Sequence, residues 1–459
     1  MRAKILGIAL AWTIASVASA QAPAEGVLGV APRIERLGNG LTVITIPWES
    51  PGIVAYYTLV RVGSRDEVEP GHSGFAHLFE HMMFRGTERY PQDRYEAVIQ
   101  SFGADNNAYT SQDHTLYTLT APSSALERIV EIEADRFQNL RYDEAVFRTE
   151  TGAVRGEYDK SASDPFLKMW EALSEMSFSR HTYGHTTLGY LRDIEAMPEM
   201  YDYSLRFFRR FYTPDNTTII VVGDVDHARL MELVRRHYGT WRGRRDRPRI
   251  PTEPEPTAGA VRHIDWPAAA SPRMLIGYRT PAFVRGRSAR ERQAALRETA
   301  ALQVVHGLAF SEPSPLYQRL VVDERALLEL GSWAGEYSRD PHLFVAYATL
   351  AEGRSFDAIL EAVQAELDRI GRGETEPERI EAVKSHIRYG MLTELQTPSD
   401  VADLVARTIA VGDRLEALDE LLAALSAVTP EDVARVARTY LTPARRFVVT
   451  LAHGRGGQP

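Results

Sequence analysis

Two histidines and a glutamate within five residues are the part of this sequence best suited to chemistry. They stand in the run His77-Leu78-Phe79-Glu80-His81. Apolar residues recur here at three- and four-residue steps, which predicts a helix. Positions four apart share a helix face, so both imidazoles can bind one zinc ion at about 2.0–2.1 Å. Glu80 flanks the same face, where it can accept a proton from a metal-bound water.

The third ligand of such a site has a candidate further along the chain. A catalytic zinc normally has three protein ligands and one open position. Glu150 and Glu157 are seven residues apart, two helical turns, on a helix face that Ala153 and Val154 make partly apolar. A carboxylate buried there needs a partner, because burying it alone is costly. On the residues alone, two other interpretations stay open: the histidines face solvent, and the glutamates form an ordinary solvated face.

Together the two stretches resemble the pitrilysin (inverzincin, M16) family of zinc metallopeptidases. His77-x-x-Glu80-His81 has the inverted order of the commoner zinc motif, and Glu157 follows 76 residues after His81. The likeness is closest to the short two-domain members, such as mitochondrial processing peptidase subunits and bacterial periplasmic members. It implies one zinc ion per chain with His77, His81 and Glu157 as ligands. It also implies Glu80 as the general base and Glu150 as a carboxylate that supports the site.

A polar run after the metal motif is a candidate peptide-binding strand. The pattern Asn-Ala-x-Thr, from Asn107 to Thr110, precedes an alternating strand pattern at residues 115–119. It resembles the active-site edge strand of the family. The resemblance implies that the backbone at Asn107 and Ala108 pairs with an extended peptide, and that Asn107 orients the substrate carbonyl. Without the resemblance, a plain hairpin edge explains the same residues.

A second pair of histidines, His181 and His185, is also spaced four apart. They lie in a stretch that resembles a loop of the family. Gly184 disfavours a helix between them, so we do not count them as metal ligands.

Length and composition predict several domains and exclude a nucleic-acid surface. A chain of 459 residues exceeds one ordinary core. The net charge is −9 and both signs are mixed, without the basic stripe that nucleic-acid binding requires. The sequence has no cysteine, so zinc must be held by nitrogen and oxygen, and no disulfide framework exists.

The first twenty residues have the organisation of a secretory signal peptide. Arg2 and Lys4 precede an apolar run, and residues 18–20 (Ala-Ser-Ala) form a small-x-small cleavage site. We therefore expect a periplasmic mature chain that begins at Gln21. A single membrane anchor is the alternative, but the run is short for a span of about 20 residues and is not repeated. No membrane span is expected in the mature chain.

The two halves of the mature chain look related. Residues 244–260 contain four prolines and predict an extended linker between an N-terminal zinc-binding domain (27–243) and a C-terminal domain without the zinc motif (261–455). Residues 211–222 and 439–450 share a Tyr, a Thr-Pro turn and a β-branched strand, which indicates duplication, with chance similarity as the alternative. The expected fold class is α+β, with two similar domains, each a mostly antiparallel sheet backed by helices.

The second half departs from the family pattern at the substrate carbonyl. Related chains place an Arg and a Tyr there, where this sequence has Val321 and Leu328. Arg319, Arg325 and Tyr337 are near but out of register. The departure implies that other residues replace the pair or that a second subunit supplies it. Since short members work as two-chain assemblies, we expect a homodimer or a heterodimer with a paralogous M16 subunit.

The expected function is zinc-dependent endopeptidase cleavage of peptides or small unfolded polypeptides. One alternative is a catalytically incomplete subunit that needs a paralogous partner to supply the Arg/Tyr pair. A catalytically dead structural subunit is another, against which the complete ligand set argues. A zinc hydrolase of non-peptide substrates is a third, and the Asn107–Thr110 strand argues against it.

Overall fold

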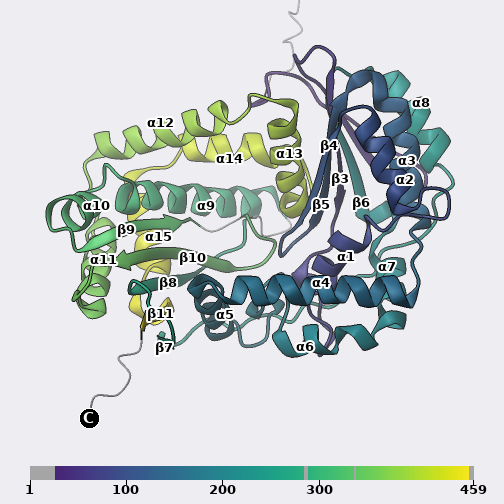
Figure 1. Cartoon of the computed structure of the whole chain (residues 1–459). Helices are drawn as coiled ribbons and strands as arrows, with labels where there is room; N and C mark the ends of the chain where they lie inside the picture. The colour runs from purple at the N-terminus through teal and green to yellow at the C-terminus, as the bar shows by residue number, and fades with distance from the viewer. Residues whose placement is uncertain (1–25, 284–287, 335–336, 454–459) are drawn as a thin grey trace, which may run out of the picture.

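Two mixed β-sheets with helices on both faces form the framework of the chain (Figure 1). The structure, a computed structural model, describes residues 26–283, 288–334 and 337–453. The expected signal peptide, residues 1–20, lies outside these ranges. In the part that the structure describes, none of the helices is both long and apolar enough to cross a membrane.

The first sheet has the strand order β1-β2-β6-β3-β5-β4. All its neighbouring strands are antiparallel except β2 and β6. The central strand β6 is buried along its whole length, as its run of β-branched residues predicts for a strand covered on both faces. The strands are β1 Arg33–Arg36, β2 Thr42–Pro47, β3 Ile53–Val60, β4 Asp105–Thr110, β5 Thr115–Pro122 and β6 Thr217–Gly223.

The second sheet repeats this topology without a counterpart of β1. Its order is β7-β11-β8-β10-β9. The first strand along the chain, β7, is parallel to the last, β11, and the remaining pairs are antiparallel. In both halves a helix that ends before a Thr-Pro turn leads into this last strand, which confirms the expected internal duplication. The strands are β7 Ala260–Trp266, β8 Arg273–Thr280, β9 Leu327–Trp333, β10 His342–Leu350 and β11 Arg446–His453.

The helices fall into two sets, one in each half of the chain. The first set is α1 Phe75–Met82, α2 Gln92–Ser101, α3 Leu126–Asn139, α4 Glu144–Ala162, α5 Pro165–Ser177, α6 Leu191–Ala196, α7 Tyr201–Phe211 and α8 His227–Tyr238. The second set is α9 Ala289–Phe310, α10 Pro315–Tyr317, α11 Phe356–Gly371, α12 Pro377–Thr393, α13 Pro398–Gly412, α14 Ala417–Ser426 and α15 Pro430–Tyr440.

One helix from each half packs on the sheet of the other half. Helix α5, from the first half, packs on β11 and β8 of the second sheet, and helix α13, from the second half, packs on β3 and β6 of the first. Side chains reinforce the contact of α13: Tyr109 on β4 donates a hydrogen bond to Asp403 on α13 at 2.9 Å, and Arg61 donates to Ala410 O near the end of α13 at 3.1 Å. The two halves therefore share their hydrophobic cores.

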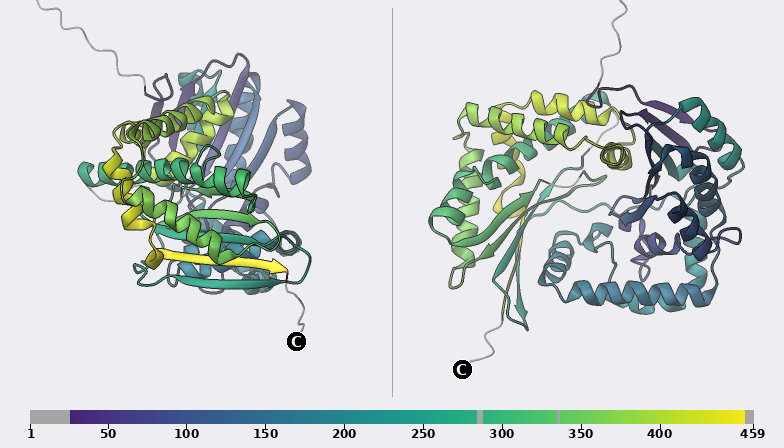
Figure 2. Two further views of the ribbon diagram at one scale, coloured as in Figure 1. Left: turned by 90° about the vertical axis from the view of Figure 1, so that its left-hand side faces the viewer. Right: turned by 45° about the horizontal axis from the view of Figure 1, so that its top comes forward.

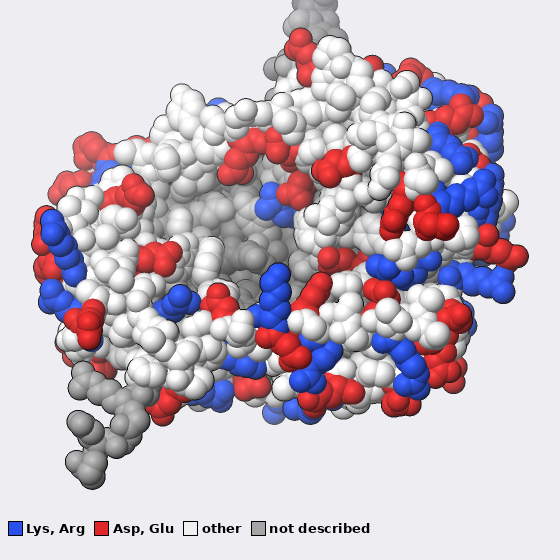
Figure 3. Space-filling model, viewed as in Figure 1, with Lys and Arg blue, Asp and Glu red and all other residues white. Residues whose placement is uncertain are grey.

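A hollow opens between the two halves on the face shown in Figure 3, with acidic side chains along part of its rim. The right-hand view in Figure 2 shows the two halves arranged in a curve. Between α8 and β7, residues 239–259 contain no helix or strand. Glu253 fixes this stretch, because its carboxylate accepts the backbone N–H groups of Ser179, Arg180 and His181 at 2.7–2.8 Å.

Candidate metal centre

Helix α1 buries one face and leaves the other partly exposed. Its buried residues are Phe75, Ala76, Leu78, Phe79 and Met82. His77, Glu80 and His81 lie on the less buried side of the helix, as the spacing of the apolar residues predicts. Helix α1 packs between β4 and α4, the helix that carries the two candidate glutamates.

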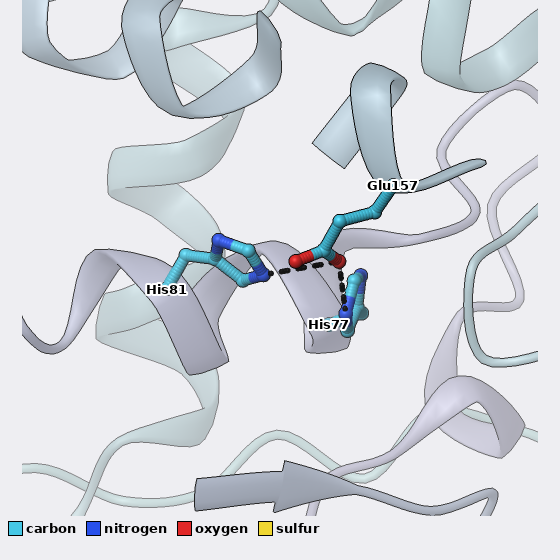
Figure 4. A group of neighbouring side chains, drawn as sticks. All are labelled: His77, His81 and Glu157. Atoms are coloured by element: carbon cyan, nitrogen blue, oxygen red, sulfur yellow. Dashed lines mark ion pairs between the residues drawn. The ribbon is translucent and has the colours of Figure 1, made fainter. Parts of the chain in front are cut away.

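Helix α4 brings Glu157 to both histidines (Figure 4). Glu157 Oε2 lies 3.3 Å from His77 Nε2 and 3.5 Å from His81 Nε2. One ligand atom from each of the three residues lies within 4.8 Å of the others. The helix begins where Asp143 caps it, accepting the N–H of Val146 at 2.9 Å, and continues without a break past Glu157.

These distances fit a zinc ion. Ligands bound at about 2.0–2.1 Å in a tetrahedron are about 3.3–3.4 Å apart, which matches both separations from Glu157. The donor set of two imidazoles and one carboxylate is one that zinc takes in catalytic sites. Glu157 is 47% exposed, whereas His77 and His81 are 12% and 16% exposed, so the group is open to solvent on the carboxylate side.

A second carboxylate stands behind the ligands. Glu150 is buried, with Oε2 at 3.8 Å from His81 Nδ1 and Oε1 at 3.3 Å from Arg85 Nε. The contact with Glu150 raises the pKa of His81, and the contact with His77 lowers the pKa of Glu157. A carboxylate behind a histidine ligand fixes the orientation of the ring and increases its basicity.

The carboxylate of Glu80 is held by the edge strand. Thr110 Oγ1, on β4, donates a hydrogen bond to Glu80 Oε2 at 2.7 Å. Glu80 is only partly buried. One carboxylate oxygen is therefore fixed by a hydroxyl while Oε1 remains available to accept a proton.

Asn107 and Ala108 lie on β4, which is the edge strand of the sheet. Ser111 N donates to His114 O at 2.8 Å and closes the β4–β5 hairpin. Because bonded and non-bonded pairs alternate along an antiparallel ladder, the N–H and C=O of Ala108 face the free edge. The side-chain oxygen of Asn107 accepts this N–H at 2.9 Å. The residue of this strand that forms a hydrogen bond with Glu80 is Thr110.

The residues near the missing Arg/Tyr pair are engaged elsewhere. The hydroxyl of Tyr337 accepts a hydrogen bond from Gln303 Nε2 on α9 at 3.2 Å, and the ring centroids of Tyr337 and Phe283 are 4.3 Å apart. Arg319 pairs with Glu324 of the same turn at 3.7 Å. Within the described ranges, neither these residues nor Arg325 forms a hydrogen bond or ion pair with the metal group.

His181 and His185 lie outside the metal group. Contrary to expectation, a short 3₁₀ helix, Thr182–Gly184, forms between them, because His181 Nδ1 caps it by accepting the N–H of Tyr183 at 3.0 Å. His185 is buried and donates through Nδ1 to Thr186 O at 2.9 Å.

The supporting roles of three residues, Thr110, Arg85 and Glu67, were not predicted from the sequence. Thr110 belongs to the Asn-Ala-x-Thr pattern, so its place on the strand carried a signal. Arg85 lies beyond the end of α1, and its Nε is 3.3 Å from Glu150 Oε1. Glu67 accepts backbone N–H groups at the start of α1, and its position before the helix gave no signal of this contact.

Two family models match the chain. The model for insulinase, peptidase family M16, matches residues 50–190 and includes both candidate metal stretches. The model for the M16 inactive domain matches residues 201–387. The match thus runs from the first half into the second.

Named relatives agree with these models over nearly the whole chain. Zinc protease PqqE of Helicobacter pylori is 25% identical over 90% of this chain and 91% of its own length. The mitochondrial-processing peptidase subunit beta of Lentinula edodes is 26% identical over 90% of this chain and 88% of its own length. The crystal structure of a protease from Helicobacter pylori matches with a TM-score of 0.84 and 25% identity, covering 92% of this chain and 99% of that one.

Proposed function

This chain belongs to the M16 family of peptidases, and we propose that it is a zinc-dependent endopeptidase of peptides and small unfolded polypeptides. The observation that carries the proposal is the convergence of His77, His81 and Glu157 around one point, with Glu80 on the same partly exposed side of the helix as the two histidines. In this proposal residues 27–243 form the zinc-binding domain, residues 261–455 a domain without zinc, and residues 244–260 the linker. One zinc ion per chain is expected.

Each residue near the proposed zinc has a distinct role. Zinc, when bound, acts as a Lewis acid that lowers the pKa of a water and polarises the scissile carbonyl. Glu80 accepts the proton of the attacking water at Oε1 and passes it to the departing amine. Thr110 holds the other oxygen of Glu80 in place, and Glu150 orients His81.

The free edge of β4 is the proposed binding place for the peptide backbone. An extended peptide can add there as a further strand and present its carbonyl beside Glu80. The hollow between the halves lies open on one face of the molecule (Figure 3). The proposed substrates are therefore extended segments, because folded proteins protect their edge strands against pairing with another chain.

A partner subunit is part of the proposal. By the family resemblance, Val321 and Leu328 take the places of an Arg and a Tyr, and the nearby Arg319 and Tyr337 have other contacts. A heterodimer with a paralogous M16 subunit would supply the pair, and a homodimer would need another residue to replace it. The second candidate function is thus a zinc-bearing subunit that cleaves only in such a complex. We place the protein in the periplasm on the signal-like first twenty residues.

The test is hydrolysis of a quenched peptide mixture by the purified mature chain, with and without a chelator and zinc add-back. We expect chelator-sensitive cleavage, one zinc per chain, and loss of turnover with retained zinc in Glu80→Gln. Glu144→Gln, an exposed glutamate of α4, is the matched control. Zinc at one per chain without cleavage would favour the incomplete subunit, whereas failure to bind zinc would exclude both candidates.

A further inference from the structure

The metal-binding helix begins without a cap of its own. Its N-cap residue is Gly74, which has no side chain to accept the first-turn N–H groups. This end of the helix is buried, because Ser73, Gly74, Phe75 and Ala76 are all buried. Unsatisfied N–H groups in such a place cost stability, so they need acceptors from elsewhere in the fold.

Glu67 supplies these acceptors from outside the helix. Its Oε2 accepts the N–H of Gly74 at 2.8 Å, and its Oε1 accepts the N–H of Ala76 at 2.7 Å. The side chain of Glu67 is fully buried. One carboxyl group thus accepts hydrogen bonds from two backbone N–H groups at the start of the helix, and the residue that follows Ala76 is His77.

A neighbouring loop holds the same turn from the other side. Asp193 accepts from the hydroxyl of Ser73 at 2.6 Å, and that hydroxyl accepts the N–H of Tyr190 at 2.8 Å. Gly74 and Gly189 both have positive φ, and their backbones approach so closely that a Cβ on Gly189 would lie 2.7 Å from Gly74 N. The start of α1 has therefore no room to shift.

The helix is fixed near its other end too. The hydroxyl of Tyr117 donates to Phe79 O at 3.0 Å, one residue before Glu80. Histidine ligands must be held to within fractions of an ångström for tight metal binding. The contacts at the two ends of α1 meet this demand through the backbone.

We propose that Glu67 is a positioning residue of the metal centre. It sets the first turn of α1, and with it the imidazole of His77, so that His77 and Glu157 are preorganised for the ion without Glu67 touching it. This inference rests on the proposed zinc function. It concerns a carboxyl group that is separate from the ligands, from Glu80 and from Glu150.

Glu67→Gln tests the inference with little change in volume. The amide keeps one acceptor but points a donor at the other N–H, so one bond to the first turn is lost. We expect the zinc dissociation constant, measured by competition with a chromogenic chelator, to rise about tenfold. Amide hydrogen exchange in α1 should also become faster in the metal-free protein, and kcat should fall with little change in KM.

The matched control is Asp226→Ala, which removes the carboxylate that caps α8 by accepting the N–H of Arg229 at 2.7 Å. It should lower the stability of the fold through the lost helix cap while zinc affinity stays unchanged. If Glu67→Gln does not fold, Ser73→Ala replaces it and should shift zinc affinity in the same direction by less.

Wild-type zinc affinity in a folded Glu67→Gln or Ser73→Ala variant would overturn the inference and leave the proposed function intact. If the wild-type chain itself bound no zinc, the proposed function would fail. The exchange of the α1 amides would still decide whether Glu67 holds the helix.

Discussion

Thr110 Oγ1 donates a hydrogen bond of 2.7 Å to Glu80 Oε2 and so joins the edge strand of the first sheet to the proposed base. The hydroxyl belongs to the strand that is expected to receive the substrate. In the proposed function, substrate position and base position are therefore both set by one six-residue element, β4.

Thr110→Val should lower kcat because it removes this hydrogen bond while keeping the shape of the side chain. A hydrogen bond to a charged group contributes about 1.5–3 kcal/mol, so a fall of roughly tenfold or more is expected. Thr110→Ser keeps the hydroxyl and should retain most of the activity. Steady-state kinetics on one quenched peptide measures both. Equal kcat values for the two variants would remove Thr110 from the mechanism.

Glu150→Gln should weaken zinc binding. The carboxylate lies 3.8 Å from His81 Nδ1 and 3.3 Å from Arg85 Nε, and its neutralisation leaves Arg85 without its charge partner. Loss of such a partner typically lowers metal affinity about 10–100-fold. Chelator competition measures the change, and exposed Glu144→Gln on the same helix is the control. An unchanged affinity would mean that Glu150 has only a packing role.

Asn107 covers part of the free edge of β4, because its side-chain oxygen accepts a hydrogen bond from the outward N–H of Ala108 at 2.9 Å. A peptide that adds to β4 must displace this bond. We expect faster exchange of the Ala108 amide in free Asn107→Ala than in the wild type. A bound, non-cleavable peptide should slow that exchange in both proteins. No protection by the peptide would contradict strand addition at this position.

The exchange of helices predicts that the two halves unfold together. Leu173 on α5 is fully buried and lies over Gly277 of the second sheet, where an added Cβ would be 3.0 Å from Leu173 Cδ1. Leu173→Ala should lower the free energy of unfolding by about 2–5 kcal/mol in one transition. Urea unfolding followed by fluorescence and circular dichroism measures it, with exposed Leu392→Ala as the control. Two separate transitions would contradict a shared core.

The local pattern of this sequence was enough to predict the elements that carry the metal group. Apolar spacing predicted α1, and the seven-residue spacing of Glu150 and Glu157 predicted one face of α4, because both signals lie within two helical turns. The recurrence of the Thr-Pro turn predicted the repeat. The exchange of α5 and α13 was not predicted, since amphipathic patterns do not say which sheet a helix covers. The role of Glu67 was not predicted either, because its partners are the backbone N–H groups of Gly74 and Ala76, and residue types do not indicate backbone contacts.

Glu67 also faces a buried histidine. Burial raises the pKa of Glu67 to about 8, although the two hydrogen bonds that its carboxyl group accepts from backbone N–H groups lower this pKa. Burial also lowers the pKa of His185. His185 donates through Nδ1 to Thr186 O, so its Nε2 is an acceptor 3.9 Å from Glu67 Oε2. A proton on Glu67 therefore has an acceptor nearby.

The stability that Glu67 contributes should fall as the pH rises. The folded state keeps its proton up to about pH 8, whereas the unfolded chain releases it near the ordinary value of about 4.3. The contribution is thus complete below about pH 4 and is lost progressively as the pH rises through 8, since the folded state binds more protons in between. Urea unfolding at several pH values, with a chelator present, measures the difference in unfolding free energy between wild type and Glu67→Gln. That difference should shrink from pH 5 to pH 8. A constant difference would mean that Glu67 is ionised in the fold across this range, held so by the N–H groups of Gly74 and Ala76.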